Sequence, residues 1–94
     1  MNAQQTCTWT ARTAVRIPRD DGSELAESAR QRLARPAGVV AVEITALEGV
    51  NPGLSATLVT VTVHADVKAT APAAVREQLV TAPGVESVES VEQL

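Results

Sequence analysis

Aromatic side chains are almost absent from this chain of 94 residues, which contains one tryptophan, Trp9, and neither phenylalanine nor tyrosine. Aromatic residues anchor most protein interfaces and line most ligand pockets. Their scarcity argues against a drug-sized pocket formed by one subunit alone. Hydrophobic residues still make up 45% of the chain, which suits one globular domain with a modest core. We therefore predict a single domain over residues 1–94, with the polar residues 1–5 disordered.

Cysteine, clustered positive charge and long apolar runs are also scarce. Cys7 is the only cysteine, which excludes an internal disulfide and a zinc site built on several thiolates, so we expect no cofactor and no metal. The net charge is −3 without a basic cluster, so we expect no nucleic-acid partner. No apolar run could span a membrane, and the first residues lack the features of a signal peptide. The expected location is the cytoplasm, away from membranes.

One stretch occurs twice in the chain, 46 positions apart. Segments 28–43 and 74–89 are identical at six of sixteen positions. The identical pairs are Arg30/Arg76, Leu33/Leu79, Gly38/Gly84, Val39/Val85, Val42/Val88 and Glu43/Glu89. Each copy reads as the end of a helix, a Pro/Gly turn and the start of a strand. The sequence therefore predicts an internal repeat of one half-domain.

The spacing of apolar residues predicts six secondary-structure elements. Alternation predicts strands over about 6–17, 39–47, 55–67 and from 85 onward, and helical spacing predicts helices over about 23–35 and 70–82. Asp21 and Glu24 resemble a capping box ahead of the first helix, and Thr70 is expected to cap the second. Residues 49–53 read as a turn. A bulge in the last strand would return Val91 to the core face.

The element order β-α-β-β-α-β belongs to the α+β class and resembles the ferredoxin-like, or split βαβ, fold over essentially the whole chain. That resemblance implies a four-stranded antiparallel sheet in the order 4-1-3-2, with two helices on one face. The first and third strands would be central. Because this fold hosts many functions, the resemblance alone assigns none.

If the odd-numbered residues of the first and third strands face the helices, their even-numbered residues form an uncovered sheet face. The predicted members of this face are Thr6, Thr8, Thr10, Arg12, Arg16, Leu58, Thr60, Thr62, His64 and Asp66, with Val39, Ala41 and Leu47 from the second strand. Such a face can stay solvated, pair with a second copy face to face or through edge strands, or hold a ligand. We expect a homodimer, with a protein partner or a small ligand as alternatives. The interface candidates on this face are Thr8, Thr10, Leu58, Thr60 and Thr62.

His64 and Asp66 are the one histidine–carboxylate pair close together in the sequence. At positions i and i+2 of one strand they share a face, about 7 Å apart, and Arg12 could join them from the neighbouring strand. One interpretation is a general base oriented by a carboxylate. The other is a surface histidine in a charge network. No motif places a serine or cysteine nucleophile, and no Gly-rich phosphate loop is present.

Cys7 and Trp9 share the core-facing side of the first strand. Trp9 either covers the end of the sheet beneath a helix or reaches a partner subunit, since tryptophan is a frequent interface anchor. We therefore include Trp9 among the interface candidates. Cys7 has no basic residue placed beside it that would make it a reactive thiol.

Two families resemble parts of this sequence. Segments 37–42 and 83–88, Ala-Gly-Val-Val-Ala-Val and Pro-Gly-Val-Glu-Ser-Val, are similar to the Gly-Val-x-x-Val-x-Val strands of heavy-metal-associated domains. Those domains bind soft metals through Cys-x-x-Cys after the first strand, and residues 18–23 contain no cysteine, so the metal function does not transfer. Residues 21–26, Asp-Gly-Ser-Glu-Leu-Ala, resemble the Asp-x-x-Gly-x-Leu helix start of ACT domains with one spacer fewer. That resemblance implies a small-molecule sensor.

We predict a non-catalytic binding or assembly module that acts through an open sheet face or edge as a homodimer. One alternative is a small enzyme similar to the α+β barrel dimers of monooxygenases and cyclases. In that case His64, Asp66 and Arg12 would form the site on the open face. The second alternative is the ACT-like sensor.

Overall fold

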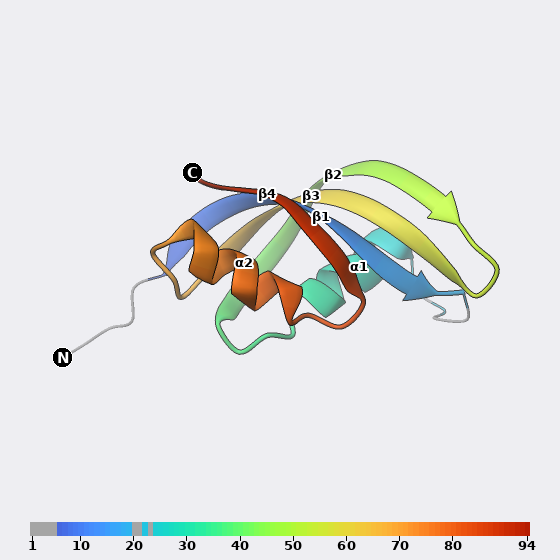
Figure 1. Cartoon of the computed structure of the whole chain (residues 1–94), viewed down its shortest axis with the longest axis horizontal. Helices are drawn as coiled ribbons and strands as arrows, with labels where there is room; N and C mark the ends of the chain where they lie inside the picture. Colours follow the sequence, from blue (N-terminus) through green and yellow to red (C-terminus); the bar gives the residue numbers. More distant parts are fainter. Residues whose placement is uncertain (1–5, 20–21, 23) are drawn as a thin grey trace.

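The computed structural model of the protein describes residues 6–19, 22 and 24–94 (Figure 1). Its elements are β1 (Cys7–Pro18), α1 (Leu25–Leu33), β2 (Val39–Pro52), β3 (Ala56–Val67), α2 (Pro72–Val80) and β4 (Val85–Gln93). The predicted α+β class, with four antiparallel strands in one sheet and two helices, is confirmed. Residues 1–5 lie outside the described residues, and so do Asp21 of the predicted capping box and part of the ACT-like segment.

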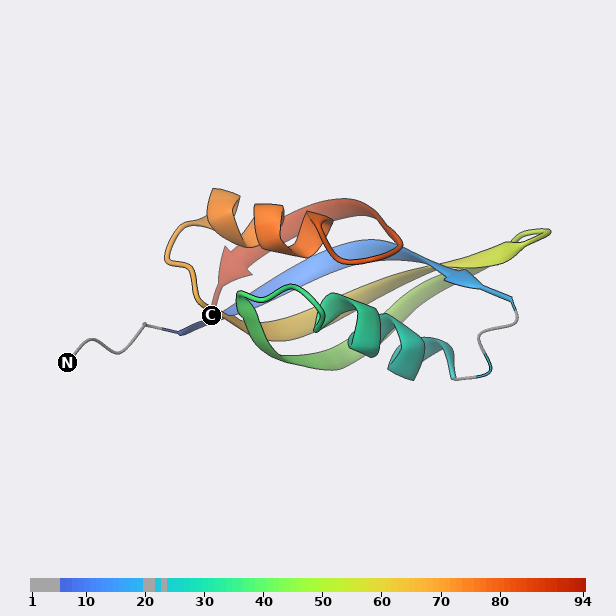
Figure 2. The same cartoon turned by 90° about the horizontal axis from the view of Figure 1, so that it is seen from below.

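The four strands lie in the order β2-β3-β1-β4, which reads 4-1-3-2 from the β4 edge, and every neighbouring pair is antiparallel. Both helices lie on one face of this sheet (Figures 1 and 2). Each βαβ half is therefore split, because a strand of the other half lies between its two strands. The pairing of β1 with β3 runs from Cys7 to Pro18 without a register shift and joins the two halves.

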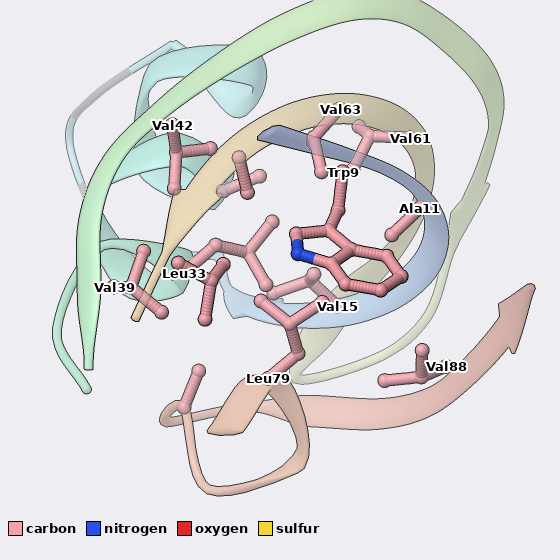
Figure 3. Packing of buried hydrophobic residues seen from close by; sticks show 14 of the residues in the cluster. Trp9, Ala11, Val15, Leu33, Val39, Val42, Val61, Val63, Leu79 and Val88 are labelled. Atoms are coloured by element: carbon pink, nitrogen blue, oxygen red, sulfur yellow. The ribbon is translucent and has the colours of Figure 1, made fainter. Parts of the chain in front are cut away.

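The core lies between the central strands and the helices. Odd-numbered residues of β1 and β3 point into it as predicted, and Val59, Val61, Val63 and Val67 are fully buried. Trp9 is 1% exposed and lies in the middle of this cluster (Figure 3). Full burial of one valine side chain contributes about 1.5–3 kcal/mol, so the central valines are a main source of the stability of the fold.

Each helix contributes one short apolar stripe. From α1, Ala29 and Leu33 are fully buried, and from α2, Val75 and Leu79. Neither helix has a side-chain cap: α1 begins after Glu24, later than predicted, and α2 begins after Ala71, so the predicted cap at Thr70 is wrong. Pro72 occupies the first turn of α2, where its missing N–H has no helical partner to lose. In the part of the chain that the structure describes, neither helix is long and apolar enough to cross a lipid bilayer.

β2 differs most from its prediction. It continues to Pro52 instead of ending at Leu47, because it stays paired with β3 as far as Thr57. Its register shifts three times, so alternation along the sequence does not follow the two faces. Val39 pairs with Val67 and Leu47 with Val61, which puts both on the helix side. The prediction that these two residues belong to the open face is wrong.

β4 has the irregularity that its sequence indicates. Its register against β1 shifts twice, leaving Glu86 and Glu89 as extra residues. The shifts keep Val85, Val88 and Val91 on the core side although they are three residues apart, and Val91 packs against the core. The predicted bulge is confirmed.

The β2–β3 hairpin extends past both helices (Figures 1 and 2). Three large apolar side chains at this end are open to solvent: Leu47 is 49%, Val50 46% and Leu54 98% exposed. Leu47 and Val50 pair with the core valines Val61 and Val59, so they continue the core stripe beyond the cover of α1. We call Leu47, Val50 and Leu54 the hairpin patch.

Candidate functional site

The open face is the side of the sheet opposite the helices, and none of the described helices or loops covers it (Figure 1). The central strands give it a floor of small polar side chains, because β1 and β3 place Thr10 opposite His64, Arg12 opposite Thr62 and Ala14 opposite Thr60. The alternation of β1 and β3 is unbroken, so this floor follows directly from the sequence.

Five of the predicted interface residues lie on the open face. Thr8 is exposed, and Thr10, Leu58, Thr60 and Thr62 are half-buried. Trp9 does not belong with them. It is buried against the helices, and a side chain that is 1% exposed in the isolated chain cannot anchor a partner. The interface prediction is therefore wrong for Trp9, and its core interpretation holds.

Bulges at the two edges supply acidic borders to this face. The bulge residue Glu48 of β2 accepts a hydrogen bond from Thr62 Oγ1 at 2.9 Å. On the other edge, Glu86 Oε2 lies 2.8 Å from Arg16 Nε and Glu89 Oε1 lies 3.4 Å from Arg12 Nε. All of these groups are about half exposed, so each pair contributes little to stability. These contacts mainly hold the charged side chains in defined positions at the edges of the open face.

Negative charge predominates on the open face. Its carboxylates are Glu43, Glu48, Asp66, Glu86, Glu89 and Glu92, and its guanidinium groups are Arg12 and Arg16. Six carboxylates against two guanidinium groups leave four uncompensated negative charges. The chain as a whole carries −3, so the excess of negative charge is concentrated on this side of the sheet.

The three predicted catalytic residues lie on the open face but have separate partners. Asp66 Oδ1 accepts a hydrogen bond from Thr8 Oγ1 at 2.6 Å. Arg12 turns toward Glu89 on β4, away from His64 and Asp66 on β3. His64 and Asp66 do line one depression of about 210 Å³, together with Thr8, Ala41, Val42 and Glu43.

A second depression lies at the hairpin end of the same face. Its volume is about 230 Å³, and Arg16, Leu58 and residues of the β2–β3 turn line it. Both depressions are smaller than the roughly 300–1,000 Å³ that small-molecule sites occupy. The open face is therefore a shallow platform rather than a pocket.

In the described ranges 6–19, 22 and 24–94, no group of three or more His, Cys, Asp or Glu side chains is arranged so that it could hold a metal ion. Cys7 is a half-buried free thiol that packs against the core. The described residues therefore place neither a metal site nor a reactive thiol on the open face.

Both sheet edges are irregular. β2 has three register shifts and ends in Pro52, and β4 has two register shifts with a glutamate at each. Bulges, charges and proline at an edge prevent a further strand from pairing there. This geometry favours the open face over the edges as an interaction surface.

The acidic borders are not predicted by the sequence. Glu48, Glu86 and Glu89 are the extra residues at register shifts, so their face follows from the pairing with β3 and β1 and not from one continuous alternation along the strand. The signal that was available is the spacing of Val85, Val88 and Val91, since a period of three in a strand requires extra residues. No comparable signal marks Glu48.

Comparisons with known proteins found no match to this chain among protein-family models, curated proteins or solved structures. The chemistry of the open face and of the hairpin patch is therefore the basis for inferring a function.

Proposed function

We propose that this chain is a cytoplasmic, non-catalytic interaction module of the ferredoxin-like type that binds a partner protein through its open face. The 4-1-3-2 strand order and the placement of both helices on one side support the fold type. One observation carries the function: none of the described elements covers one side of the sheet, while both sheet edges are bulged. A shallow face with a threonine floor and charged borders suits a macromolecular surface better than a small molecule.

The enzyme alternative is weaker on geometry. A general base needs its orienting group and its substrate within hydrogen-bond reach. Asp66 is hydrogen-bonded to Thr8 and Arg12 is paired with Glu89. The depression beside His64 is shallow and small. These residues suit a charged binding surface better than an active site.

Site-specific photocrosslinking in cells tests the open-face proposal. A photoreactive amino acid is placed at Thr60, which is half-buried in the middle of the open face, and in a control at Glu77, which is exposed on α2. We expect one discrete adduct from position 60 and none from position 77. Adducts from position 77 alone, or from neither position, would contradict the proposal.

Homodimer formation belongs to this proposal, with the hairpin patch as its interface. Two open faces laid on each other would bring acidic borders against acidic borders, which like-charge repulsion disfavours. Leu47, Val50 and Leu54 offer an exposed apolar surface instead, of the kind that marks interaction sites. A second copy would cover this patch on both subunits at once.

Sedimentation of the Leu47→Ser/Leu54→Ser variant tests the dimer. We expect the wild type to sediment as a dimer and the variant as a monomer, while Val80→Ser, which removes an apolar residue of α2 that is about as exposed as Leu47, stays dimeric. A strictly monomeric wild type would reject the dimer and leave the open-face proposal standing.

A further inference from the structure

We infer that the open face takes a lysine- and arginine-rich segment of another protein. This inference rests on the proposed function, because it names the partner chemistry of the same surface. Its first support is the charge of the face, where four negative charges have no positive partner on the same strands. A sheet face with predominantly negative charge complements a segment with predominantly positive charge.

Two of the carboxylates are positioned to act as anchors. Glu43 lies opposite His64, and Glu92 lies opposite Thr10, so all four residues stand in one row across the sheet. Both glutamates are exposed, and neither has a hydrogen bond or ion pair with any residue that the structure describes. Three interstrand spacings separate them, about 14 Å. A partner can therefore place one cationic side chain at each end of the row.

The depression beside His64 gives the row a receiving site. Glu43 and Asp66 line it together with His64 and the Thr8 hydroxyl. Two carboxylates and a hydroxyl are acceptors for an ammonium or guanidinium group. The volume of about 210 Å³ is sufficient for the end of one lysine or arginine side chain and too small for a larger ligand.

The floor beside the row lets a chain approach closely. Thr10, Thr60 and Thr62 are short side chains, and Ala14 adds no bulk. The hydroxyl groups of Thr10 and Thr60 can donate to and accept from a backbone that lies over them, and the Thr62 hydroxyl, which donates to Glu48, can accept. Acidic borders on both sides then favour a cationic segment over a neutral one.

The negative charge of the open face also disfavours other binding partners. Nucleic acids and anionic membranes carry the same sign as this face. A second copy would present the same acidic borders. A small polyamine remains a competitor, and the experiment below separates it from a polypeptide.

Fluorescence anisotropy with a labelled peptide of alternating lysine and threonine tests the inference. At about 0.15 M salt, where charges beyond roughly 8 Å are screened, we expect saturable binding to the wild type and none with the glutamate analogue of the peptide. The Glu43→Gln/Glu92→Gln variant should bind about three- to tenfold more weakly, because it loses two exposed ion pairs and each contributes modestly to affinity. The matched control is Glu24→Gln/Glu77→Gln, which removes two exposed glutamates away from the open face and should bind within about twofold of the wild type.

Three results would overturn the inference: no binding of the lysine peptide, equal weakening in both double variants, or displacement of the peptide by spermine at equal charge concentration. A crosslinked partner at Thr60 whose contacting segment is not basic would also reject it while leaving the proposed function intact. If position 60 gives no adduct, the proposed function itself fails.

Discussion

The two βαβ halves use the same buried residues in the same way and the same surface residues differently. Leu33 of α1 and Leu79 of α2 are 46 positions apart, and both are fully buried. The glycine turns are also reciprocal: Gly38 lies against Gln78 of α2, and Gly84 lies toward Arg32 of α1. Gln78 and Arg32 are themselves 46 positions apart.

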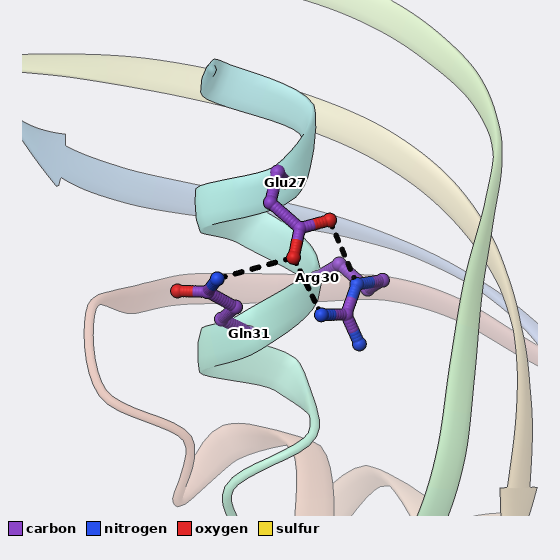
Figure 4. A network of polar contacts seen from close by, with 3 residues as sticks. All are labelled: Glu27, Arg30 and Gln31. Atoms are coloured by element: carbon purple, nitrogen blue, oxygen red, sulfur yellow. Dashed lines mark hydrogen bonds and ion pairs between the residues drawn. The ribbon is translucent and has the colours of Figure 1, made fainter. Parts of the chain in front are cut away.

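The paired arginines show the contrast. Arg30 forms a bidentate ion pair with Glu27 of its own helix, at 3.0 and 2.6 Å, and Gln31 Nε2 donates to the same carboxylate at 3.1 Å (Figure 4). Arg76 has Ala73 at the corresponding position and instead donates to the Val88 carbonyl of β4. Packing therefore fixes what the core positions do, whereas a surface arginine takes its role from whatever acceptor is nearby. Substitutions at equivalent positions of the two halves test this difference.

The largest expected effect comes from the shared leucines. Leu33→Ala and Leu79→Ala should each lower the free energy of unfolding by about 2–5 kcal/mol, because each leaves a cavity under its helix. Urea denaturation followed by circular dichroism measures both. Equal losses would support equivalent packing of the two helices. A loss below about 1 kcal/mol for either one would mean that its helix is not part of the core.

Substitution by alanine should lower the free energy of unfolding more at Gly84 than at Gly38. Gly84 has φ +85°, and a Cβ there would lie 2.6 Å from the Arg16 carbonyl oxygen, so Gly84→Ala should cost about 1–3 kcal/mol or more. A Cβ at Gly38 would meet only the movable end of Gln78, at 2.7 Å, and its φ is not positive. Gly38→Ala should therefore stay within about 1 kcal/mol of the wild type. Equal thermal unfolding temperatures for the two variants would contradict the turn geometry.

The paired arginines should respond differently to salt. Arg76→Met keeps the apolar stem but loses the hydrogen bond to β4, so it should cost about 1 kcal/mol. Arg30→Met loses an exposed ion pair and should cost less. In about 1 M salt, screening should abolish the effect of Arg30→Met and leave that of Arg76→Met. Denaturant titrations at two salt concentrations measure both.

The smallest expected effect is a pH dependence of the free energy of unfolding that arises from Glu27 in the first βαβ half. Hydrogen bonds from Arg30 and then Gln31 lower the pKa of Glu27 from 4.5 to about 2. A carboxylate whose pKa is lowered by folding stabilises the fold above its unfolded pKa and loses that contribution as pH falls toward the folded pKa. The stability difference between wild type and Glu27→Gln should be constant above about pH 5 and vanish near pH 2. Glu77→Gln on α2 serves as the control, and a pH trend of equal size there would contradict the assignment to Glu27.

The sequence was sufficient to predict the central part of this fold. β1 and β3 alternate without interruption, and each has neighbours on both sides, so their valine and threonine faces could be assigned residue by residue. β2 could not be assigned because it carries apolar residues at consecutive positions, such as Val39 and Val40, and its register depends on β3. Residues 49–52 of the turn predicted at 49–53 belong to β2 instead, because pairing with β3 outweighs the local preference of Gly49.

The candidate site could be predicted in part. The threonine floor follows from the alternation of β1 and β3, and His64 and Asp66 lie where the sequence put them. The partner of Arg12 could not be predicted, because it depends on a β4 bulge that turns Glu89 toward it. Charges on edge strands take their direction from tertiary pairing, which spacing along the chain does not encode.

The burial of Trp9 has a practical consequence. It is the only aromatic residue in the chain, it is enclosed by the cluster that joins both halves, and its Nε1 has no hydrogen-bond partner among the described residues. Its emission spectrum therefore reports on one environment, which lies on the opposite side of the sheet from the proposed binding face. We expect burial to shift its emission to the blue, so a red shift should report global unfolding without an introduced dye, while binding at the open face should leave the emission unchanged. One intrinsic probe can thus separate variants that unfold the protein from variants that only stop it from binding.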